Sequence, residues 1–219
     1  AQVLFSQGFG ARRECEGRVL DGQVEIDGSV HDDPDEELNP EGLVLHIQGR
    51  AWPYHAKALV MLHKPAGYEC SMKPKHHPSV MSLLPLPLRV RGLLLTDDGP
   101  LIHRLTSPKH HVPKVYDVTC KHAVSDEQLQ RLKKGVVLDD DPQPVLAEGA
   151  ERTGSHTLQL TLVQGKYHQV KRMLAAVGNR VEALHRSRFG PLVLTPDLAP
   201  GQWAWLNAGM SWAEPAVSR

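Results

Sequence analysis

The chain has 219 residues, of which 41% are hydrophobic and 23% charged, and its basic and acidic residues balance to a net charge of zero. This composition excludes disordered, collagen-like and coiled-coil proteins, and we expect neither a membrane span nor a signal peptide. Three cysteines without a CxxC spacing argue against a disulfide framework, so we expect a protein of the reducing cytoplasm.

The charge is unevenly distributed along the chain. Residues 1–56 carry 4 Lys/Arg against 11 Asp/Glu, a net charge of −7, so residues 57–219 carry a net charge of +7. This asymmetry predicts separate units, with a basic working surface on the larger one.

Residues 1–48 predict a small α/β unit, and residues 49–57, which contain Trp52-Pro53, predict a linker. The elements expected in the small unit are a helix around Leu4, a helix over 11–20, a hairpin over 24–30 that turns at Asp27-Gly28, an acidic loop over 32–37 and a strand over 43–47.

Residues 58–219 predict a larger domain in which strands and helices mix without regular alternation. We expect strands over 59–62, 93–95, 114–121, 157–163, 192–194 and 203–206, helices over 126–134 and 166–177, and loops over 73–88 and 139–144. This pattern favours an α+β fold with a largely antiparallel mixed sheet.

Two stretches concentrate positive charge. Residues 164–190 hold six Lys/Arg against Glu182 alone, and residues 103–121 hold four against Asp117 alone. Such clusters suit phosphate contacts, because each contact releases condensed counterions; a solvated basic face is the alternative.

Tyr116 and Lys171 are the candidate catalytic residues. Tyr116 lies within an apolar strand, where it is either a core residue or a platform for a flipped base. Lys171 is either a surface lysine or the partner of a carboxylate that it keeps ionised. The pairs His76-His77 and His110-His111 lack the spacing of a helical zinc site, so we expect no metal.

Several long motifs resemble those of the RNA pseudouridine synthases of the ribosomal small-subunit type. The motifs are HKPAGY at 63–68, LLLTDDG at 93–99, HRLTSPKHH at 103–111, KVY at 114–116, GKYHQVKRM at 165–173 and AAVGN at 175–179. Residues 1–48 resemble the small RNA-binding module that precedes the catalytic domain in this family, and 58–219 would be that catalytic domain.

The resemblance implies an isomerase that converts one uridine of ribosomal RNA to pseudouridine without a cofactor. Tyr116 would stack on the base, and Lys171 would pair with a catalytic aspartate. We expect a cytoplasmic monomer whose partner is ribosomal RNA or a pre-ribosomal particle. The expected RNA contacts are Arg12, Arg13, Arg18, Lys64, Arg104, Lys109, His110, His111, Lys114, Lys166, His168, Gln169 and Arg172.

The sequence departs from the family at the catalytic aspartate. The family's Gly-Arg-Leu-Asp motif is missing, because Gly92 runs straight into Leu93, and Asp97 and Asp98 match the downstream turn instead. One explanation is a deletion that leaves a non-catalytic RNA-binding or assembly protein. The other, which we favour, is a mobile loop of the natural chain that this sequence omits between Gly92 and Leu93.

Three further expectations can be compared with the structure. The motifs at 106–111 and 197–201 favour small-subunit over large-subunit RNA. The acidic loop over 32–37 is expected to lie away from the helix that carries Arg12, Arg13 and Arg18. Tyr167 and Lys171 are four residues apart in a predicted helix, so they would share one side of it.

Overall fold

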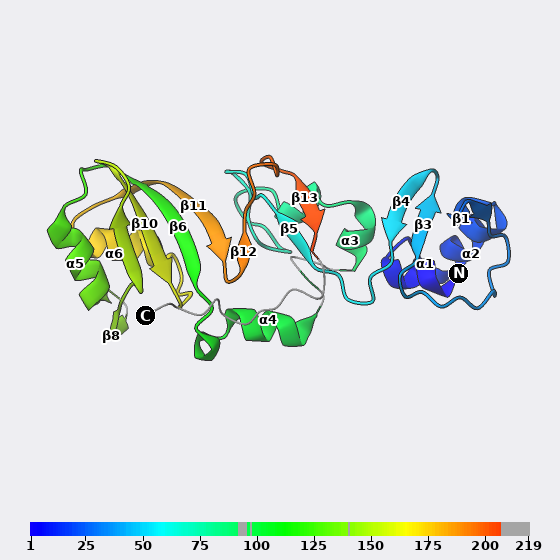
Figure 1. Ribbon diagram of the computed structural model, residues 1–219, viewed down its shortest axis with the longest axis horizontal. Helices are drawn as coiled ribbons and strands as arrows, with labels where there is room; N and C mark the ends of the chain where they lie inside the picture. Colours follow the sequence, from blue (N-terminus) through cyan, green and yellow to red (C-terminus); the bar gives the residue numbers. More distant parts are fainter. Residues whose placement is uncertain (92–95, 97, 140, 207–219) are drawn as a thin grey trace. The chain divides into compact units, whose positions relative to one another are not determined.

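The computed structural model describes residues 1–91, 96, 98–139 and 141–206, and its elements are labelled in Figure 1. Among these residues, one compact unit is built from the chain up to Gly99 and again from Pro196, and a second from Pro100–Thr195. No helix within the described ranges is long and apolar enough to cross a membrane.

The N-terminal part of the first unit is an antiparallel sheet with two helices. Helices α1 (Gln2–Gln7) and α2 (Arg12–Leu20) precede strands in the order β2-β1-β3-β4. The strands are β1 (Val24–Ile26), β2 (Ser29–Val30), β3 (Val44–Ile47) and β4 (Arg50–Pro53). The predicted turn is confirmed: Asp27 and Gly28 have φ values of 50° and 79°, as a tight hairpin turn requires.

Strand β4 corrects the prediction of a linker over 49–57. Residues Arg50–Pro53 pair with β3, and Trp52 is only 9% exposed. Its ring meets those of Phe9 and Trp205 edge-on, with centroids 5.1 and 5.3 Å away. These residues belong to one hydrophobic cluster that also includes Ala58. The functional division into a module at 1–48 and a catalytic domain at 58–219 stays a prediction.

The proline-rich stretch 73–88 is partly helical, contrary to the predicted loop. It contains a 3₁₀ helix, Val80–Leu83, and the first residues of α3 (Leu86–Val90). Pro87 lies in the first turn of α3, where the N–H that proline lacks would have had no helical partner.

Two segments far apart in sequence meet in the first unit: β5 (Val60–Leu62) pairs with β13 (Trp203–Trp205). The predicted strand at 93–95 and the Gly92–Leu93 junction lie outside the described residues.

A five-stranded sheet in the order β12-β11-β6-β10-β9 forms the centre of the second unit. Its strands are β6 (Lys114–Cys120), β9 (Gly149–Arg152), β10 (Thr157–Leu162), β11 (Val181–Phe189) and β12 (Leu192–Val193). Helix α4 (Gly99–Thr106) and a 3₁₀ turn, Pro108–His110, precede it in the sequence. Every pair of named strands among the described residues is antiparallel, so the predicted α+β class is confirmed.

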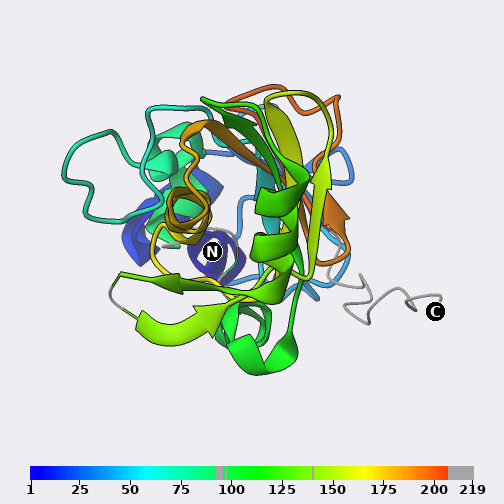
Figure 2. The same ribbon diagram turned by 90° about the vertical axis from the view of Figure 1, so that its left-hand side faces the viewer.

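Helices α5 (Asp126–Lys134) and α6 (Gln169–Ala176) lie beside this sheet, as Figures 1 and 2 show. The predicted cap of α5 is confirmed, because the Ser125 hydroxyl accepts the Gln128 N–H at 3.2 Å. The helices bury apolar side chains against the strands in a core that includes Leu158, Leu160, Met173 and Leu174.

Two further corrections concern the second unit. Helix α6 begins at Gln169, three residues later than the predicted helix at 166–177. The predicted loop over 139–144 contains most of β8 (Asp141–Val145), which pairs with β7 (Val136–Leu138) in a two-stranded sheet of its own. The prolines of β8 are compatible with this small sheet, because neither needs to donate to a central ladder.

Candidate active site and RNA-contact residues

A cavity of about 180 Å³ in the second unit lies where β6, β10, β11 and the start of α6 converge. Both candidate catalytic residues line it. The lining residues are Tyr116, Leu162, Gln164, Gly165, Lys166, His168, Gln169, Val170, Lys171 and Leu184. The sequence places these residues in three separate stretches, and the sheet brings them together.

Tyr116 enters the cavity from the middle of the central strand β6. It is half-buried and packs against the core of the unit. Leu160 of β10 lies opposite it on one side and Arg186 of β11 on the other. The tyrosine therefore packs against the core and also lines the cavity, and its role as a platform for a flipped base stays a prediction.

Lys171 lies in the first turn of α6, and its side chain is exposed. It forms no ion pair with any described residue. The first turn of α6 carries no acidic residue, so the positive end of the helix dipole adds to the charge of Lys171. This part of the cavity is therefore suited to an anionic group.

The segment before α6 is a tight turn and not a helix. His168 has a left-handed backbone with φ of 46° and serves as the N-cap residue. The prediction that Tyr167 and Lys171 share a helix side is therefore wrong, because Tyr167 precedes the helix. The side chain of Gln169 closes the turn by accepting the Lys166 N–H at 2.8 Å.

An ion pair holds the same turn from outside. The ammonium group of Lys166 donates to the carboxylate of Asp141 at the start of β8. The pKa of Asp141 is lowered because its carboxylate accepts from Lys166 and from the Gln143 N–H. Much of the charge of Lys166 is thus engaged within the protein, although the residue lines the cavity.

Two predicted RNA contacts are buried. Gln169 is only 4% exposed, and its amide also approaches the sulfur of Met173 at 3.7 Å. Lys114 is 6% exposed and donates to the Val163 carbonyl at 3.2 Å. Burial, and secondarily the charge of Arg186, lowers the pKa of Lys114. Neither side chain is freely exposed on the surface, although Gln169 lines the cavity, so RNA contacts by these two residues stay predictions.

The remaining predicted contacts of the second unit are more accessible. Arg104 is exposed on α4, and Lys109, His110 and His111 are exposed at the end of the 3₁₀ turn and just after it. His168 is exposed at the cavity. Arg172 is half-buried and donates to the Tyr167 carbonyl at 3.0 Å.

Arg186 lies next to a residue that lines the cavity and was missing from the predicted contacts. It is exposed on β11, directly across from Tyr116, and its guanidinium lies 5.1 Å from the centre of the Phe189 ring. The signal that could have found it was the basic cluster at 164–190. The prediction missed it because β11 was not recognised as a strand next to Tyr116.

The predicted contacts in the first unit are more dispersed. Arg13 is exposed on α2, Arg18 is half-buried and lies near the Gln23 side chain at 3.4 Å, and Lys64 is exposed but donates to two backbone carbonyls of its own loop. Arg12 donates to Gln2 at 3.1 Å and lies 4.8 Å from the centre of the Phe5 ring.

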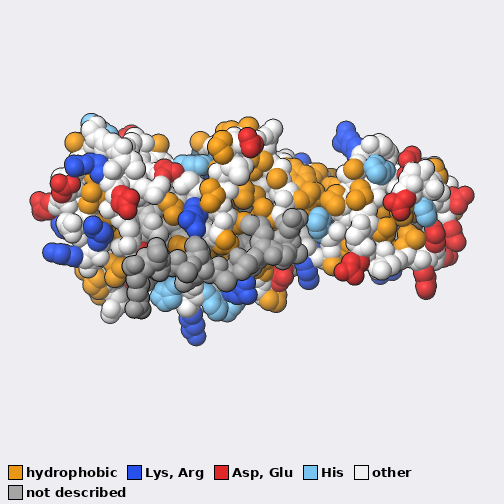
Figure 3. Space-filling model, viewed as in Figure 1, with side chains coloured by type: hydrophobic (Ala, Val, Ile, Leu, Met, Phe, Trp, Pro, Cys, Tyr) orange, Lys and Arg blue, Asp and Glu red, His pale blue; other side chains and the backbone are white. Residues whose placement is uncertain are grey.

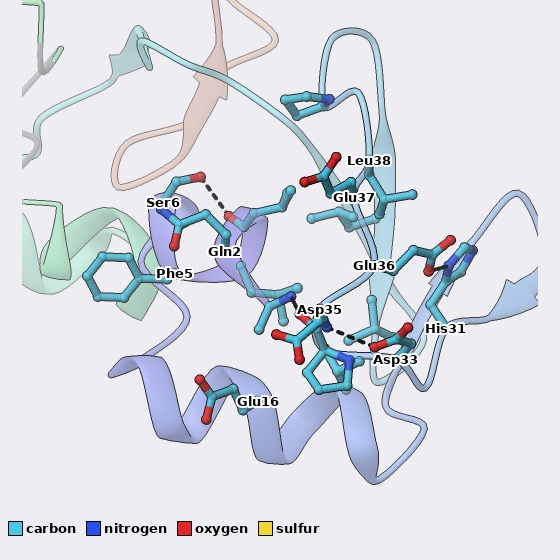
Figure 4. Close-up of a pocket in the computed structure, with 18 of the residues that line it drawn as sticks. Gln2, Phe5, Ser6, Glu16, His31, Asp33, Asp35, Glu36, Glu37 and Leu38 are labelled. Carbon is cyan, nitrogen blue, oxygen red and sulfur yellow. Dashed lines mark hydrogen bonds and ion pairs between the residues drawn. The ribbon is translucent and has the colours of Figure 1, made fainter.

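The acidic loop does not lie away from α2, contrary to expectation. A pocket of about 630 Å³ is lined by Asp33, Asp35, Glu36 and Glu37 of the loop together with Arg12 and Glu16 of α2. Figure 4 shows the loop carboxylates and Glu16 around this pocket, and Figure 3 shows acidic side chains gathered over the N-terminal elements. Arg12 therefore lines the same pocket as several carboxylates.

No cluster of three or more His, Cys, Asp or Glu residues with metal-binding geometry is found in the described part of the chain. That the site works without a metal stays a prediction.

Comparison with known proteins identifies the family, although no family model matches the chain. The chain is 37% identical over 214 residues to "Ribosomal small subunit pseudouridine synthase A" of Salmonella typhimurium, a match that covers 91% of this chain and 93% of the relative. The protein of the same name from Yersinia pestis is 38% identical over 216 residues, with 92% and 89% covered.

A solved structure described as "Crystal structure of pseudouridylate synthase" matches with a TM-score of 0.63 and 27% identity, covering 94% of each chain. The sequence matches and the fold lead to the same conclusion: the chain belongs to the family of ribosomal small-subunit pseudouridine synthases.

Proposed function

We propose that this protein isomerises a uridine of small-subunit ribosomal RNA to pseudouridine at the cavity beside Tyr116. The observation that carries the proposal is that Tyr116 and Lys171, predicted as a pair from separate motifs, line one cavity. The relatives' names, which specify the ribosomal small subunit, support the choice of substrate.

The cavity residues suggest how the chain handles the base. A uridine must leave its stack to expose the bond between base and ribose. The ring of Tyr116 would stack on the flipped base, with Leu162 and Leu184 as apolar walls. Lys171, at the positive end of α6, would stabilise a carboxylate beside the ribose, because an opposite charge favours the ionised form.

The carboxylate itself is the finer part of the proposal. We infer that it belongs to a segment that the natural enzyme carries between Gly92 and Leu93, and that this sequence lacks. The alignments support a missing segment. The Salmonella match spans 214 positions but takes in 91% of 219 residues, about 199, so about 15 positions of the relative have no counterpart here.

A second candidate function follows from the same absence. Without the aspartate, a chain with this basic surface would be a non-catalytic RNA-binding or assembly protein. The fold and the cavity suit both functions, and turnover separates them.

The experiment compares two forms of the protein. One is the 219-residue chain, and the other carries a segment with the family's Gly-Arg-Leu-Asp motif inserted between Gly92 and Leu93. Each is incubated with a small-subunit ribosomal RNA transcript, and pseudouridine is mapped along it. We expect the chain with the insertion to convert one uridine, and the 219-residue chain to bind RNA without converting it.

The matched control carries the insertion with its aspartate replaced by asparagine, and it should bind without turnover. If the chain with the insertion folds and binds but converts no uridine, the protein is an RNA-binding protein and the enzymatic proposal fails. If the 219-residue chain converts uridine by itself, the missing segment is not the source of the carboxylate.

We further infer that the protein acts as a cytoplasmic monomer on ribosomal RNA or on a partly assembled particle. The described residues that line the cavity all come from the second unit of one chain, which supports the monomer.

A further inference from the structure

Two stacked aromatic rings lie at the edge of the cavity and have no role in the proposal above. The rings of Tyr167 and His168 are stacked, with centroids 3.9 Å apart and planes 21° from parallel. His168 lines the cavity, so the stack begins there and extends outward to Tyr167. Tyr167 is 78% exposed although one of its faces lies on His168, so its other face is open to solvent.

Hydrogen bonds and an ion pair hold the turn that carries these two rings. The Tyr167 carbonyl accepts from Arg172 at 3.0 Å, and the His168 carbonyl accepts the Arg172 N–H at 3.1 Å. On the other side of the turn, the Lys166 N–H is bound to Gln169 and its ammonium group to Asp141. The turn is therefore fixed at both ends, which lowers the entropic cost of binding a ligand to the exposed ring.

The surroundings of the stack favour an RNA base as its occupant. An exposed tyrosine offers a large flat surface with little side-chain entropy to lose, and every nucleobase has a face that can stack on it. Lys171 lines the same cavity as His168, and Arg172 binds the Tyr167 carbonyl, so both place positive charge close to the stack for the phosphates that accompany a base. A peptide partner would gain less from this combination of ring and positive charge.

We propose that the Tyr167–His168 stack is a binding platform for the nucleobase next to the uridine that enters the cavity. When the uridine flips out, its neighbour loses a stacking partner, and Tyr167 replaces that partner at the rim. The inference rests on the proposed function for the identity of the cavity's occupant. The platform would make the identity or presence of one flanking base part of substrate recognition.

The test compares the RNA affinity of several protein variants across several RNA probes, and it needs no turnover. The probes are a single-stranded RNA 9-mer of adenosines with one central uridine, and two versions with an abasic site on the 5′ or the 3′ side of that uridine. Dissociation constants are measured for the wild type, Tyr167→Leu and Tyr167→Phe. Removing an aromatic stacking partner weakens single-strand binding by roughly five-fold to a hundred-fold.

We expect Tyr167→Leu to weaken binding of the intact 9-mer within that range and Tyr167→Phe to restore it. On one of the two abasic probes, the wild type and Tyr167→Leu should bind equally weakly, because the base that stacks is gone. The slope of affinity against salt should not change, since the substitution removes no charge. As a matched control, Val193→Ala trims another exposed side chain and should leave all affinities unchanged.

Equal binding of Tyr167→Leu and wild type to the intact 9-mer would overturn the platform. So would an equal loss on all three probes, because the tyrosine would then support the fold instead of a base. Failure of the proposed function is distinguishable. If the chain with the insertion makes no pseudouridine but these affinities follow the expected pattern, the protein is an RNA-binding protein that still uses Tyr167 as the platform.

Discussion

Replacing Gln169 with methionine separates its structural role from the RNA contact expected from the sequence. Methionine keeps the volume of the side chain but removes the oxygen that accepts the Lys166 N–H at 2.8 Å. Such a hydrogen bond contributes about 0.5 to 1.5 kcal/mol, and a buried donor left without a partner costs about 1 to 3 kcal/mol. Because Lys166 is half-buried and water can reach part of the turn, we expect a loss of about 1 to 2 kcal/mol.

The assay is urea unfolding followed by circular dichroism, with hydrogen exchange at the Lys166 amide as a local readout. The amide should lose protection in Gln169→Met, while the salt slope of RNA binding stays unchanged. Gln159→Met is the matched control, since its amide donates to Asp117 at 3.0 Å on the exposed face of the sheet. It should change stability by less than about 0.5 kcal/mol.

The reasoning would be refuted if Gln169→Met were as stable as the wild type but bound RNA more weakly with a lower salt dependence. The side chain would then reach RNA in spite of its burial.

Three other predictions follow from the site. In the chain with the insertion, Lys171→Met should abolish single-turnover isomerisation with little loss in filter binding, and Lys171→Arg should keep part of the activity; a proportional loss of both would make Lys171 a phosphate contact. Arg13→Gln should lower the salt slope of RNA binding by about 1. Arg12→Gln should lower it by less, because the Arg12 guanidinium already contacts Gln2 and the Phe5 ring. Equal effects of the two substitutions would contradict this prediction. Because the pKa of Lys114 is lowered in the folded protein, the unfolded chain binds more protons between that pKa and 10.5. The contribution of Lys114 to the free energy of unfolding therefore rises with pH across this window. Lys114→Met should remove that rise from the measured unfolding free energy.

The local signals in the sequence predicted the elements whose boundaries depend on local chemistry. The Asp27-Gly28 turn needs two residues that tolerate positive φ, and the Ser125 cap needs a hydroxyl three residues before a glutamine. Both were predicted because the deciding interactions lie within a few residues. The strand β10 was predicted because its leucines alternate strictly, with every second side chain buried.

Strand β11 was missed for an equally physical reason. Most of its side chains are exposed, and two irregularities, between Val181 and Ala183 and between Arg186 and Arg188, shift its register against β6. An irregular strand with an exposed face shows no period of two, so only its pairing with β6 reveals it. The placement of Arg186 across from Tyr116 could not be predicted for the same reason.

The start of α6 shows how a side chain can overrule a helical pattern. Residues 166–168 suit a helix by composition, but the Gln169 side chain binds the Lys166 N–H and His168 adopts a left-handed backbone. These interactions turn the chain before the helix and point Tyr167 outward. The motif pointed to residues that line the cavity, whereas the geometry that separates buried Gln169 from exposed Tyr167 required the fold.

The most direct test of the central claim is a map of pseudouridine in both ribosomal RNAs from a strain that lacks this gene. The account predicts that one pseudouridine disappears from the small-subunit RNA and returns when the natural gene is restored. Loss confined to the large-subunit RNA, or no loss in either RNA, would contradict it.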